Sequence, residues 1–422
     1  MNFPSAGAMR PTLVLVAAIA LAGMARADDG AALSTPDGLV QAVLETNPGL
    51  QAMQAAVDEA RARADAAGRL ADPTLAYLSA PETIGSRIGT RHIVQIGQAV
   101  PWPGTLADRR ARGQALGTAR RHASEDYRLQ LARSARTLFA EWQYAHAGLA
   151  VNRQQQLLVS EMIEAARGRY SGGRGSQQEV LQAQLQAEQL KQSALDWAQR
   201  IETLAAQINA LLNRPADAAL PRPVDAFDDD RPEPAPPNTH PAVAELDAER
   251  RSREVEVALA ERARYPEFRL MANYLGTLDP DEKRLQLGAS INLPIQFGRQ
   301  RADEDAARAA LARSRYRLED RRAQLSAERA AALAAHRRAD RSAELLETGT
   351  LPLAVDNLNA ALADYRSGRG SFLNVIDAQQ RQLRAELDLN RARADRARAI
   401  ADWQRWSPAA AGGPTADLTG DK

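Results

Sequence analysis

A fifteen-residue phrase occurs twice in this chain, almost two hundred residues apart. The first copy, YSGGRGSQQEVLQAQ, covers residues 170–184, and the second copy, YRSGRGSFLNVIDAQ, covers residues 365–379. The copies share a tyrosine, a G-R-G-S core, a valine and an Ala-Gln pair, all at a constant offset of 195 residues. This repeat constrains the fold more than the composition does, because duplicated sequence specifies a duplicated structural unit.

Further landmarks repeat at nearly the same distance. A segment bounded by two prolines occurs at 48–73 and again at 241–266, an offset of 193 residues. The Val-Pro pair at 100–101 and the Leu-Pro pair at 293–294 are also 193 residues apart. Chance agreement of all these landmarks is improbable, and the drift from 193 to 195 requires only two inserted residues. The sequence therefore predicts two copies of one unit.

The N-terminus has the pattern of a secretory signal peptide. Arg10 supplies a positive charge, residues 12–22 form an apolar run, and Ala25-Arg26-Ala27 is a small-x-small cleavage site. The apolar run is shorter than the roughly 20 residues that a bilayer helix needs, so the pattern favours export over a membrane anchor.

Domain boundaries follow from the repeats and from two irregular segments. Seven prolines lie within 214–238, which is typical of a linker with little regular structure. The Ala/Gly/Pro-rich end of the chain predicts a disordered tail. The expected organisation is a signal peptide at 1–27, a first repeat at 28–213, the linker at 214–238, a second repeat at 239–406 and the tail at 407–422.

Composition excludes several classes of protein. The chain has 54 basic and 53 acidic residues, a net charge of +1 that gives no electrostatic preference for nucleic acid. It has no cysteine, which excludes disulfides, thiolate metal sites and lipid attachment through an N-terminal Cys. Its five histidines are scattered, and the sequence has no G-x-S-x-G, H-E-x-x-H or Gly-rich phosphate loop followed by Lys. We therefore expect no enzyme activity, no cofactor and no metal site.

Each repeat is predicted to open with a helix. Asn47 and His240 suit the N-cap position, and the proline after each suits the first helical position. We expect these helices to stop at the second proline of each segment, Pro73 or Pro266.

Two strand-like segments follow the opening helix in each repeat. In the second repeat, apolar and polar residues alternate over 267–274 and over 284–293. The corresponding segments of the first repeat, 74–80 and 91–100, show a fainter alternation. A two-residue period places apolar side chains on one face of a strand and polar side chains on the other.

A long helical hairpin is predicted after the strands. No proline occurs between 103 and 215, and a helix over 105–169 would be about 100 Å long at 1.5 Å per residue. Apolar residues recur in alternating steps of four and three, the period of supercoiled helices, although Gln380 interrupts it in the second repeat. The repeated glycines suit a tight turn at the hairpin tip. Pro352 predicts a kink or break in the second outgoing helix.

The strands limit the possible assemblies. Four strands of about ten residues have the length of outer-membrane strands. Four cannot close a barrel, and lipid does not tolerate open edges, so several protomers would have to contribute strands. The alternative is a periplasmic coiled-coil scaffold or adaptor without a pore. That alternative leaves the amphipathic strands without a core, and adaptors typically have one hairpin where this chain has two.

The repeated order of helix, two strands, "PWPG", long helix, Y-x-x-G turn and return helix resembles the TolC-type outer-membrane efflux family, over about 35–406. The resemblance implies a mainly α fold with a small membrane β-barrel portion. Three chains would close a twelve-stranded β-barrel on an α-helical barrel. The family forms passive exit channels in the outer membrane, with the helices in the periplasm. Their partners are a periplasmic adaptor protein and an inner-membrane transporter, here expected to be of the RND type.

The resemblance also implies where the functional residues lie. The tip turns would form the periplasmic aperture and contact the adaptor through Tyr170, Gly173, Arg174, Gly175, Ser176, Tyr365, Gly368, Arg369, Gly370 and Ser371. The sequence AVPWPGTL at 99–106 resembles the motif of heavy-metal efflux relatives, so heavy-metal cations are one expected cargo.

Acidic residues just past the tips are the candidate gate. Glu179 and Asp377 match positions where the family places acids, and Asn374 and Gln182 stand where another acid can occur. Three copies of each carboxylate would give a negative ring that favours cations and can hold a gate closed through hydrogen bonds or ion pairs. Alternatively, Glu179 only occupies the first turn of a helix, where the macrodipole favours an acid. The tip arginines would pair with these acids or with the adaptor.

Overall fold

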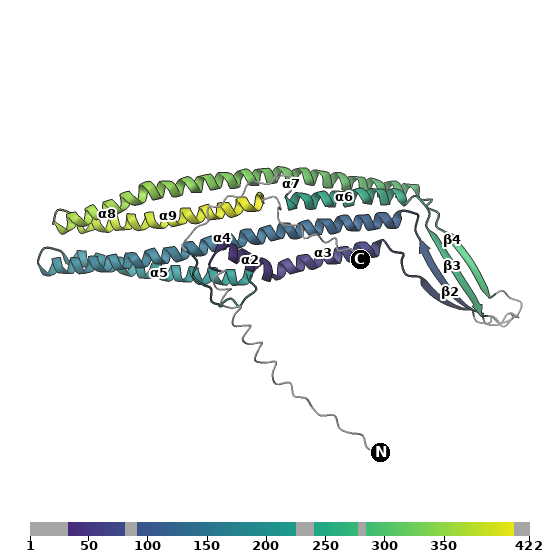
Figure 1. Ribbon diagram of the computed structural model, residues 1–422, viewed down its shortest axis with the longest axis horizontal. Coiled ribbons are helices and arrows are strands. Elements are labelled where there is room, and N and C mark those ends of the chain that lie inside the picture. The colour runs from purple at the N-terminus through teal and green to yellow at the C-terminus, as the bar shows by residue number, and fades with distance from the viewer. Residues whose placement is uncertain (1–32, 81–90, 225–239, 277–283, 409–422) are drawn as a thin grey trace, which may run out of the picture. The chain divides into compact units, whose positions relative to one another are not determined.

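The structure is a computed structural model that describes residues 33–80, 91–224, 240–276 and 284–408 (Figure 1). These residues form long helices and one antiparallel sheet, and they divide into two compact units. The predicted signal peptide, most of the predicted linker and nearly all of the predicted tail lie outside the described residues. No helix in the described part of the chain is both long and apolar enough to cross a membrane.

The first unit, here called the strand unit, comprises the described residues of 49–127 and 236–326. Its elements are α3 (Pro48–Ala67), β1 (Thr74–Ala80), β2 (Arg91–Val100), the first part of α4 (Thr105–Ser171), α6 (Pro241–Arg262), β3 (Phe268–Gly276), β4 (Leu285–Ile291) and the first part of α7 (Phe297–Leu345). The order of elements is the same in both repeats, as the offset of 193 residues predicts.

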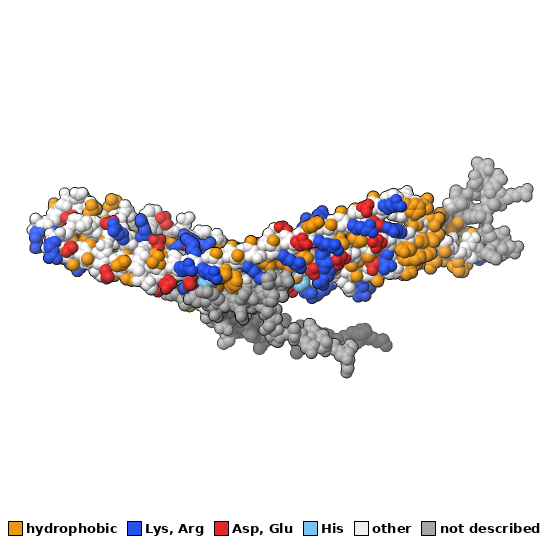
Figure 2. All heavy atoms as spheres, turned by 90° about the horizontal axis from the view of Figure 1, so that it is seen from above, with side chains coloured by type: hydrophobic (Ala, Val, Ile, Leu, Met, Phe, Trp, Pro, Cys, Tyr) orange, Lys and Arg blue, Asp and Glu red, His pale blue; other side chains and the backbone are white. Residues whose placement is uncertain are grey.

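The four strands form one antiparallel sheet in the order β1-β2-β3-β4. The alternating sequence puts large apolar side chains on one face, where two cross-strand rows are Leu75, Ile96, Ala272, Leu287 and Tyr77, Val94, Tyr274, Leu285. Most of these side chains are exposed, up to 80% for Leu287. Hydrophobic side chains gather over this end of the unit, whereas basic and acidic side chains intermix along the helices (Figure 2). The sheet therefore has an apolar face that the described chain does not cover.

Strand positions agree with the sequence-based prediction, and the opening helices agree less well. β1 and β2 have the predicted bounds, whereas β4 ends at Ile291, two residues early, because Pro294 has no N–H to continue the ladder. α3 ends at Ala67, directly before a glycine, and α6 ends at Arg262, so neither helix reaches the second proline. The two prolines restrict only the residue directly before each of them, so they do not account for these earlier helix ends.

One of the two predicted N-caps is confirmed by a side-chain hydrogen bond, and the other stays a prediction. His240 caps α6, because its Nδ1 accepts a hydrogen bond of 3.2 Å from the N–H of Ala242. Asn47 lies directly before α3 and also ends α2 (Pro36–Thr46), a helix that the sequence reasoning missed although Thr35 caps it. The Asn47 amide donates to the carbonyl of Leu211 at 3.0 Å, so this side chain fixes a tertiary contact.

The second unit, here called the tip unit, comprises the described residues of 1–48, 128–235 and 327–422. It contains α2, the remainder of α4 and α7, α5 (Gln177–Leu211), α8 (Leu351–Arg366) and α9 (Phe372–Trp406). We call α4 and α5 the first hairpin, and α8 and α9 the second hairpin. The predicted break at Pro352 is confirmed by a π-helical segment at Leu346–Thr350. Proline clashes with the carbonyl four residues earlier, and a wider turn relieves that clash.

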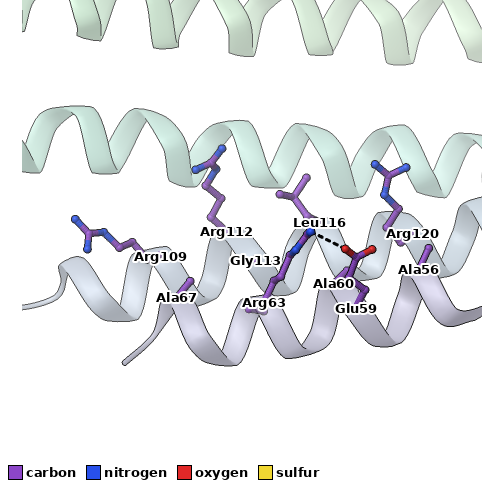
Figure 3. A pocket seen from close by; sticks show the side chains of 11 residues that line it. Ala56, Glu59, Ala60, Arg63, Ala67, Arg109, Arg112, Gly113, Leu116 and Arg120 are labelled. Atoms are coloured by element: carbon purple, nitrogen blue, oxygen red, sulfur yellow. Dashed lines mark ion pairs between the residues drawn. The ribbon is translucent and has the colours of Figure 1, made fainter. Parts of the chain in front are cut away.

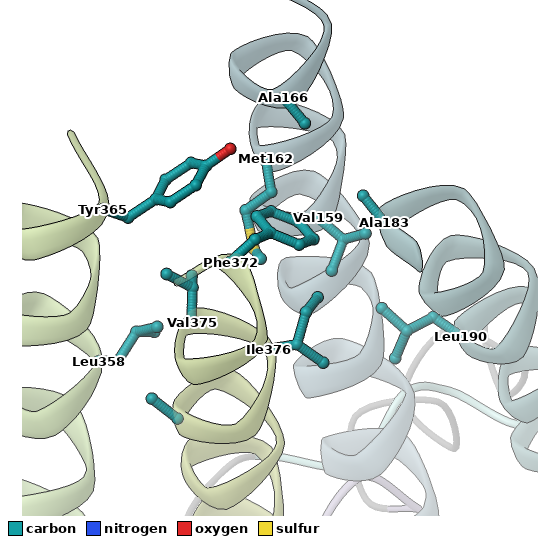
Figure 4. Packing of buried hydrophobic residues seen from close by; sticks show 11 residues of the cluster. Val159, Met162, Ala166, Ala183, Leu190, Leu358, Tyr365, Phe372, Val375 and Ile376 are labelled. Atoms are coloured by element: carbon teal, nitrogen blue, oxygen red, sulfur yellow. The ribbon is translucent and has the colours of Figure 1, made fainter. Parts of the chain in front are cut away.

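The two hairpins share one hydrophobic core near their tips (Figure 4). Its members come from all four helices: Val159, Met162, Ala166, Ala183, Leu190, Leu358, Tyr365, Phe372, Val375, Ile376 and Ala378. The spacing of three and four residues that predicted supercoiled helices supplies these buried positions. The core fixes the second hairpin against the first and so positions the tip residues.

Candidate aperture site at the hairpin tips

The repeated phrase folds into the same backbone turn in both hairpins. The first glycine of each core has a positive φ, 66° at Gly173 and 76° at Gly368, which glycine adopts without a Cβ penalty. The two residues after it donate their N–H groups to one carbonyl, that of Arg169 in the first hairpin and of Asp364 in the second, at 2.9–3.1 Å. This pattern satisfies carbonyl groups that the helix end would leave unpaired.

The serine of the phrase then starts the return helix. Ser176 Oγ accepts from the N–H of Glu179, and Ser371 Oγ accepts from the N–H of Asn374, each at 3.3 Å. These are N-caps of α5 and α9. Glu179 therefore occupies the first turn of a helix, as one sequence interpretation proposed, and it completes the Ser-x-x-Glu capping pattern.

The second glycine of each core is required by packing within the chain. A Cβ on Gly175 would lie 3.2 Å from the backbone nitrogen of Tyr170, and a Cβ on Gly370 would lie 3.2 Å from that of Tyr365. The sequence analysis explained the repeated glycines by a tight turn at the hairpin tip. The structure adds a reason internal to the turn, because a side chain there would press on the preceding helix.

Tyr365 connects the two hairpins. Its side chain is only 3% exposed, and its hydroxyl donates a hydrogen bond to Glu179 Oε2 at 2.8 Å. The Arg169 guanidinium stands over the ring, 4.4 Å from its centre, and Arg169 Nη1 donates to the Tyr365 carbonyl at 2.6 Å. A cation over an aromatic face and a bond to a carboxylate are both favourable in a desolvated site. We call Tyr365, Glu179 and Arg169 the Tyr365 latch.

The surroundings of Tyr365 keep its hydroxyl protonated. Burial and the hydrogen bond to Glu179, with the negative charge of that carboxylate, raise the pKa of Tyr365 to about 12, against the opposing charge of Arg169. A tyrosine with an ordinary pKa already donates at neutral pH. The shift therefore extends the pH range in which the latch keeps its proton.

The equivalent tyrosine of the first hairpin has no such site in this chain. Tyr170 lies at the matching position of the same turn, but half of its surface is exposed. The residue before each tyrosine also differs, since Arg169 of the first hairpin is replaced by Asp364 in the second. Asp364 pairs with Arg369 of its own tip at 3.4 Å. The two tips thus share a backbone and differ in their side-chain contacts.

A layer of glutamines lies behind the tips. Gln379 is fully buried and donates to Gln155 Oε1 at 2.8 Å, and Gln380 donates to Gln186 Oε1 at 3.1 Å. Each bond joins the second hairpin to the first. Gln380, which interrupted the apolar period in the sequence, is therefore a contact between hairpins. A buried polar pair such as Gln379 and Gln155 can fix the register of packed helices.

Comparison with known proteins extends this picture. The second repeat matches the family model described as outer membrane efflux protein, over residues 238–403. No curated protein matches the chain in sequence. Solved structures match nearly all of it: the outer membrane protein VceC from Vibrio cholerae is 17% identical, covers 88% of this chain and 95% of its own, and superposes with a TM-score of 0.76.

Two further channels have the same fold. The open state of the Neisseria gonorrhoeae MtrE outer membrane channel is 18% identical, with 88% of each chain covered and a TM-score of 0.77. CusC is 16% identical, with 88% of this chain and 92% of its own covered and a TM-score of 0.78. The predicted resemblance to TolC-type outer-membrane efflux proteins is confirmed. The family model matches the second repeat, and the solved structures show that the fold of these outer membrane channels extends over both repeats.

The candidate gate residues have different surroundings. Glu179 and Gln182 are half-buried, whereas Asn374 and Asp377 are exposed. Asp377 pairs with Arg381 of its own helix at 2.8 Å. Sequence reasoning proposed that Arg369 pairs with these acids or with an adaptor, but within this chain it pairs with Asp364. The sequence analysis did not identify Arg169 as a site residue. The signal that could have found it is the replacement of Arg169 by Asp364 at the equivalent position of the second repeat.

The strand unit contains a groove between α3 and α4 (Figure 3). Its volume is about 410 Å³, and small side chains and four arginines line it. Acids neutralise most of these arginines: Arg63 pairs with Glu59 at 2.5 Å, and Arg112 approaches Glu256 at 3.7 Å. The groove therefore presents little uncompensated charge to a ligand, and the tips are the stronger candidate site.

Proposed function

We propose that this protein is the outer-membrane exit channel of a tripartite efflux system. It passively conducts substrates that an inner-membrane transporter of the RND type and a periplasmic adaptor hand over. The observation that carries the proposal is the four-stranded sheet with an uncovered apolar face, attached to duplicated helical hairpins in the fold of solved outer membrane channels.

The sheet supports an assembly of three copies. β1 and β4 are its edges, and an edge strand exposes a row of backbone N–H and C=O groups that lipid does not hydrate. Pairing β1 of one copy with β4 of the next satisfies those groups. Three copies of a four-stranded sheet give a twelve-stranded barrel whose outer face is the apolar face described above.

A pair of matched variants tests whether that face meets lipid. Leu287 is 80% exposed on the apolar face of β4, and Gln286 is its neighbour on the opposite face. An arginine on the lipid face of a membrane barrel costs about 2–4 kcal/mol at mid-bilayer. Leu287→Arg should therefore reduce assembly into the outer membrane, measured by cell fractionation and by the heat-modifiable oligomer, whereas Gln286→Arg should not. Equal behaviour of the two variants, or recovery of the native protein in the soluble periplasm, contradicts the channel and favours the scaffold alternative.

The tips are proposed as the periplasmic aperture. Glu179 and Asp377, with Gln182 and Asn374 one turn away, would contribute to the ring around the constriction, and the exposed turn residues would contact the adaptor. The Tyr365 latch supports this role, because it is a charged contact between hairpins at the place where an aperture has to open. Asp377, which pairs with Arg381 of its own helix at 2.8 Å, would contribute one carboxylate per copy to the ring.

Conductance in planar bilayers tests the aperture. Asp377→Ala should raise single-channel conductance or lower the preference for cations, because it removes one carboxylate per copy from the ring. Asp356→Ala, which removes an exposed acid from α8, is the matched control and should leave both properties unchanged. If Asp377→Ala behaves like the control, Asp377 does not line the aperture.

Heavy-metal cations are the proposed cargo. The support is the AVPWPGTL sequence and the shared fold with CusC, which is a likeness of fold alone. The described residues hold no cluster of three or more His, Asp or Glu side chains that could bind a metal ion, and a passive duct does not require one. A deletion strain should become sensitive to copper, silver, zinc, cobalt or cadmium salts. Unchanged metal tolerance with increased drug sensitivity would reassign the cargo.

A further inference from the structure

A second pocket of the strand unit lies where the helices meet the sheet. Its volume is about 550 Å³, and the end of α3, the start of α4, the end of α6 and the residues that flank β3 and β4 line it. Three arginines line it together with the rings of Trp102 and Tyr265: Arg109, Arg112 and Arg262. We call it the junction pocket. Arg109 and Arg112 also line the neighbouring groove between α3 and α4 (Figure 3).

The PWPG motif builds one wall of the junction pocket. The Arg262 guanidinium donates to the Asp108 carboxylate and, at 3.0 Å, to the carbonyl of Pro103. Gly104 makes room for this guanidinium, because its φ is +89° and a Cβ there would lie 2.6 Å from Arg262 Nη1. Thr105, the first residue of α4, also lines the pocket, so the partial positive charge of a helix N-terminus lies beside it. The motif thus fixes a cation at the junction.

The other two arginines keep hydrogen-bond donors for a ligand. Arg109 Nη2 lies 3.9 Å from Glu267 Oε1, and Arg112 Nη2 lies 3.7 Å from Glu256 Oε1, which are longer distances than hydrogen bonds have. Glu256 instead accepts a bond of 2.6 Å from Arg253. The Nε atom of Arg112 is buried and has no hydrogen-bond partner among the described residues. Nearby acids therefore attract both guanidinium groups without occupying their donors.

Arginines exceed acids in the ion pairs around the junction pocket. Within the described part of the chain, these pairs join four arginines to three acids: Arg109, Arg112, Arg253 and Arg262 to Asp108, Glu256 and Glu267. One positive charge is left over. A phosphodiester carries one negative charge on two free oxygens, and the planar fork of arginine matches phosphate oxygens in pairs. The charge and the donors of the pocket therefore fit a phosphodiester.

The junction pocket is continuous with the apolar face of the sheet. The ring of Trp102 stacks on Tyr265, with 4.8 Å between ring centres, and on Phe268, with 6.0 Å between ring centres. Phe268 begins β3 and shares the apolar face with Tyr274, because residues an even number apart on a strand lie on one face. Exposed apolar side chains also follow β4: Leu293, Ile295 and Phe297. A ligand that occupies both surfaces needs an anionic head and an apolar tail.

We propose that the junction pocket binds the phosphate headgroup of an anionic glycerophospholipid, whose acyl chains lie on the apolar face of the sheet. Arg109 and Arg112 donate to the phosphate oxygens, and Trp102 lies between the head and the chains, where amphipathic rings are favoured. A zwitterionic lipid would bring its own ammonium group beside the arginines, so the site prefers an anionic headgroup. The inference deepens the proposed channel, on which it rests, by naming a lipid that fixes the depth of the sheet in the membrane.

Lipid titration tests the preference for an anionic headgroup. Full-length protein in detergent is titrated with dioctanoyl phosphatidylglycerol and with dioctanoyl phosphatidylcholine, and binding is measured by calorimetry and native mass spectrometry. The native protein should bind phosphatidylglycerol about tenfold more tightly or better, and Arg109→Gln with Arg112→Gln should lose this preference, because bonds to charged groups of this kind are worth at least about tenfold each. The matched control, Arg110→Gln with Arg128→Gln, removes the same charge from exposed positions of α4 outside the pocket and should keep it. Equal losses in both variants contradict the site.

Trp102 provides a test in a protein with all its arginines. The other four tryptophans belong to the tip unit: Trp142, Trp197, Trp403 and Trp406. In phosphatidylcholine vesicles, a minor share of phosphatidylglycerol brominated on its acyl chains should quench fluorescence more than the same share of brominated phosphatidylcholine. Trp102→Phe should remove the difference. Equal quenching by the two brominated lipids in the native protein overturns the inference, whatever the arginine variants do.

The outcomes separate the lipid site from the proposed function. If inorganic phosphate binds the native protein as tightly as dioctanoyl phosphatidylglycerol does, the pocket is a site for free phosphate and the lipid inference is wrong. If the protein fractionates with the outer membrane as a heat-modifiable oligomer but shows no preference for phosphatidylglycerol, the lipid inference is wrong and the channel stands. If the native protein is recovered in the soluble periplasm, the proposed channel fails and the lipid inference fails with it.

Discussion

The two hairpin tips have nearly the same sequence and the same backbone turn, yet only one of their tyrosines is buried in the chain. Tyr365 is almost fully buried in the latch, and Tyr170 is half exposed. The turns agree in the positive φ of their first glycine, in the shared carbonyl acceptor and in the serine cap. The comparison teaches that the repeated phrase determines the turn, whereas single substitutions next to it determine what the turn contacts.

The largest expected difference between the tips is the effect of removing each tyrosine. Tyr365→Ala deletes a buried ring, and large-to-small changes of buried aromatics cost about 3–5 kcal/mol. Tyr170→Ala in a single chain should cost about 0.5 kcal/mol, as exposed substitutions do. Hydrogen exchange of amides in α8 and α9 would measure the local free energy of opening. Equal losses of protection in the two variants would remove the distinction between the tips.

Alkaline pH should break the latch in a defined range. The pKa of Tyr365 is about 12 when folded and about 10 when unfolded. Because the folded value is the higher one, its stabilising contribution is complete below pH of about 10 and disappears as the pH rises through about 12. Hydrogen bonds to charged groups contribute about 1.5–3 kcal/mol, which sets the size of the effect. Conductance or hydrogen exchange of α8 should change in that range.

Tyr365→Phe is the control for the alkaline transition. It keeps the ring under Arg169 and lacks the hydroxyl, so its tips should be weakened at neutral pH and should show no further change between pH of about 10 and about 12. A transition of undiminished size in Tyr365→Phe would assign the pH effect to another group.

The glycine turns should show the smallest difference between the two tips. Gly173 and Gly368 both have a positive φ, and a Cβ on either would meet no atom within 4 Å. Alanine at each position therefore costs only backbone strain, about 1–2 kcal/mol. The two variants should lower the thermal midpoint by the same amount. A clearly larger effect at one tip would show that the turns are not equivalent.

Much of the fold could be predicted because it depends on local periods and on duplication. The strand segments predicted in the first repeat coincide with β1 and β2, and Pro352 located the break in the second outgoing helix, because both signals act through nearby backbone. The tip turns could be predicted for the same reason. Their glycines and serines make bonds to groups only a few residues away.

The side-chain contacts of the site could not be predicted in the same way. Whether Tyr170 or Tyr365 is buried depends on contacts with a helix of the other repeat. Both copies of the phrase have a tyrosine at the same position, so the phrase does not distinguish them. Asn47 shows the same limit: its place directly before α3 could be predicted, but the bond from its amide to the Leu211 carbonyl could not. Tertiary partners more than a hundred residues away decided both cases.

The π-helical segment at Leu346–Thr350 has a consequence for how the second tip is aimed. Each residue added to an unbroken α-helix turns everything beyond it by about 100°. The second repeat has gained two residues relative to the first between the strands and the tip, since the offset grows from 193 to 195. A turn bonded i→i+5 takes up one additional residue without that rotation. The widened turn therefore takes up one of the two added residues, which reduces the rotation that the longer path would otherwise give to the helix that carries Tyr365.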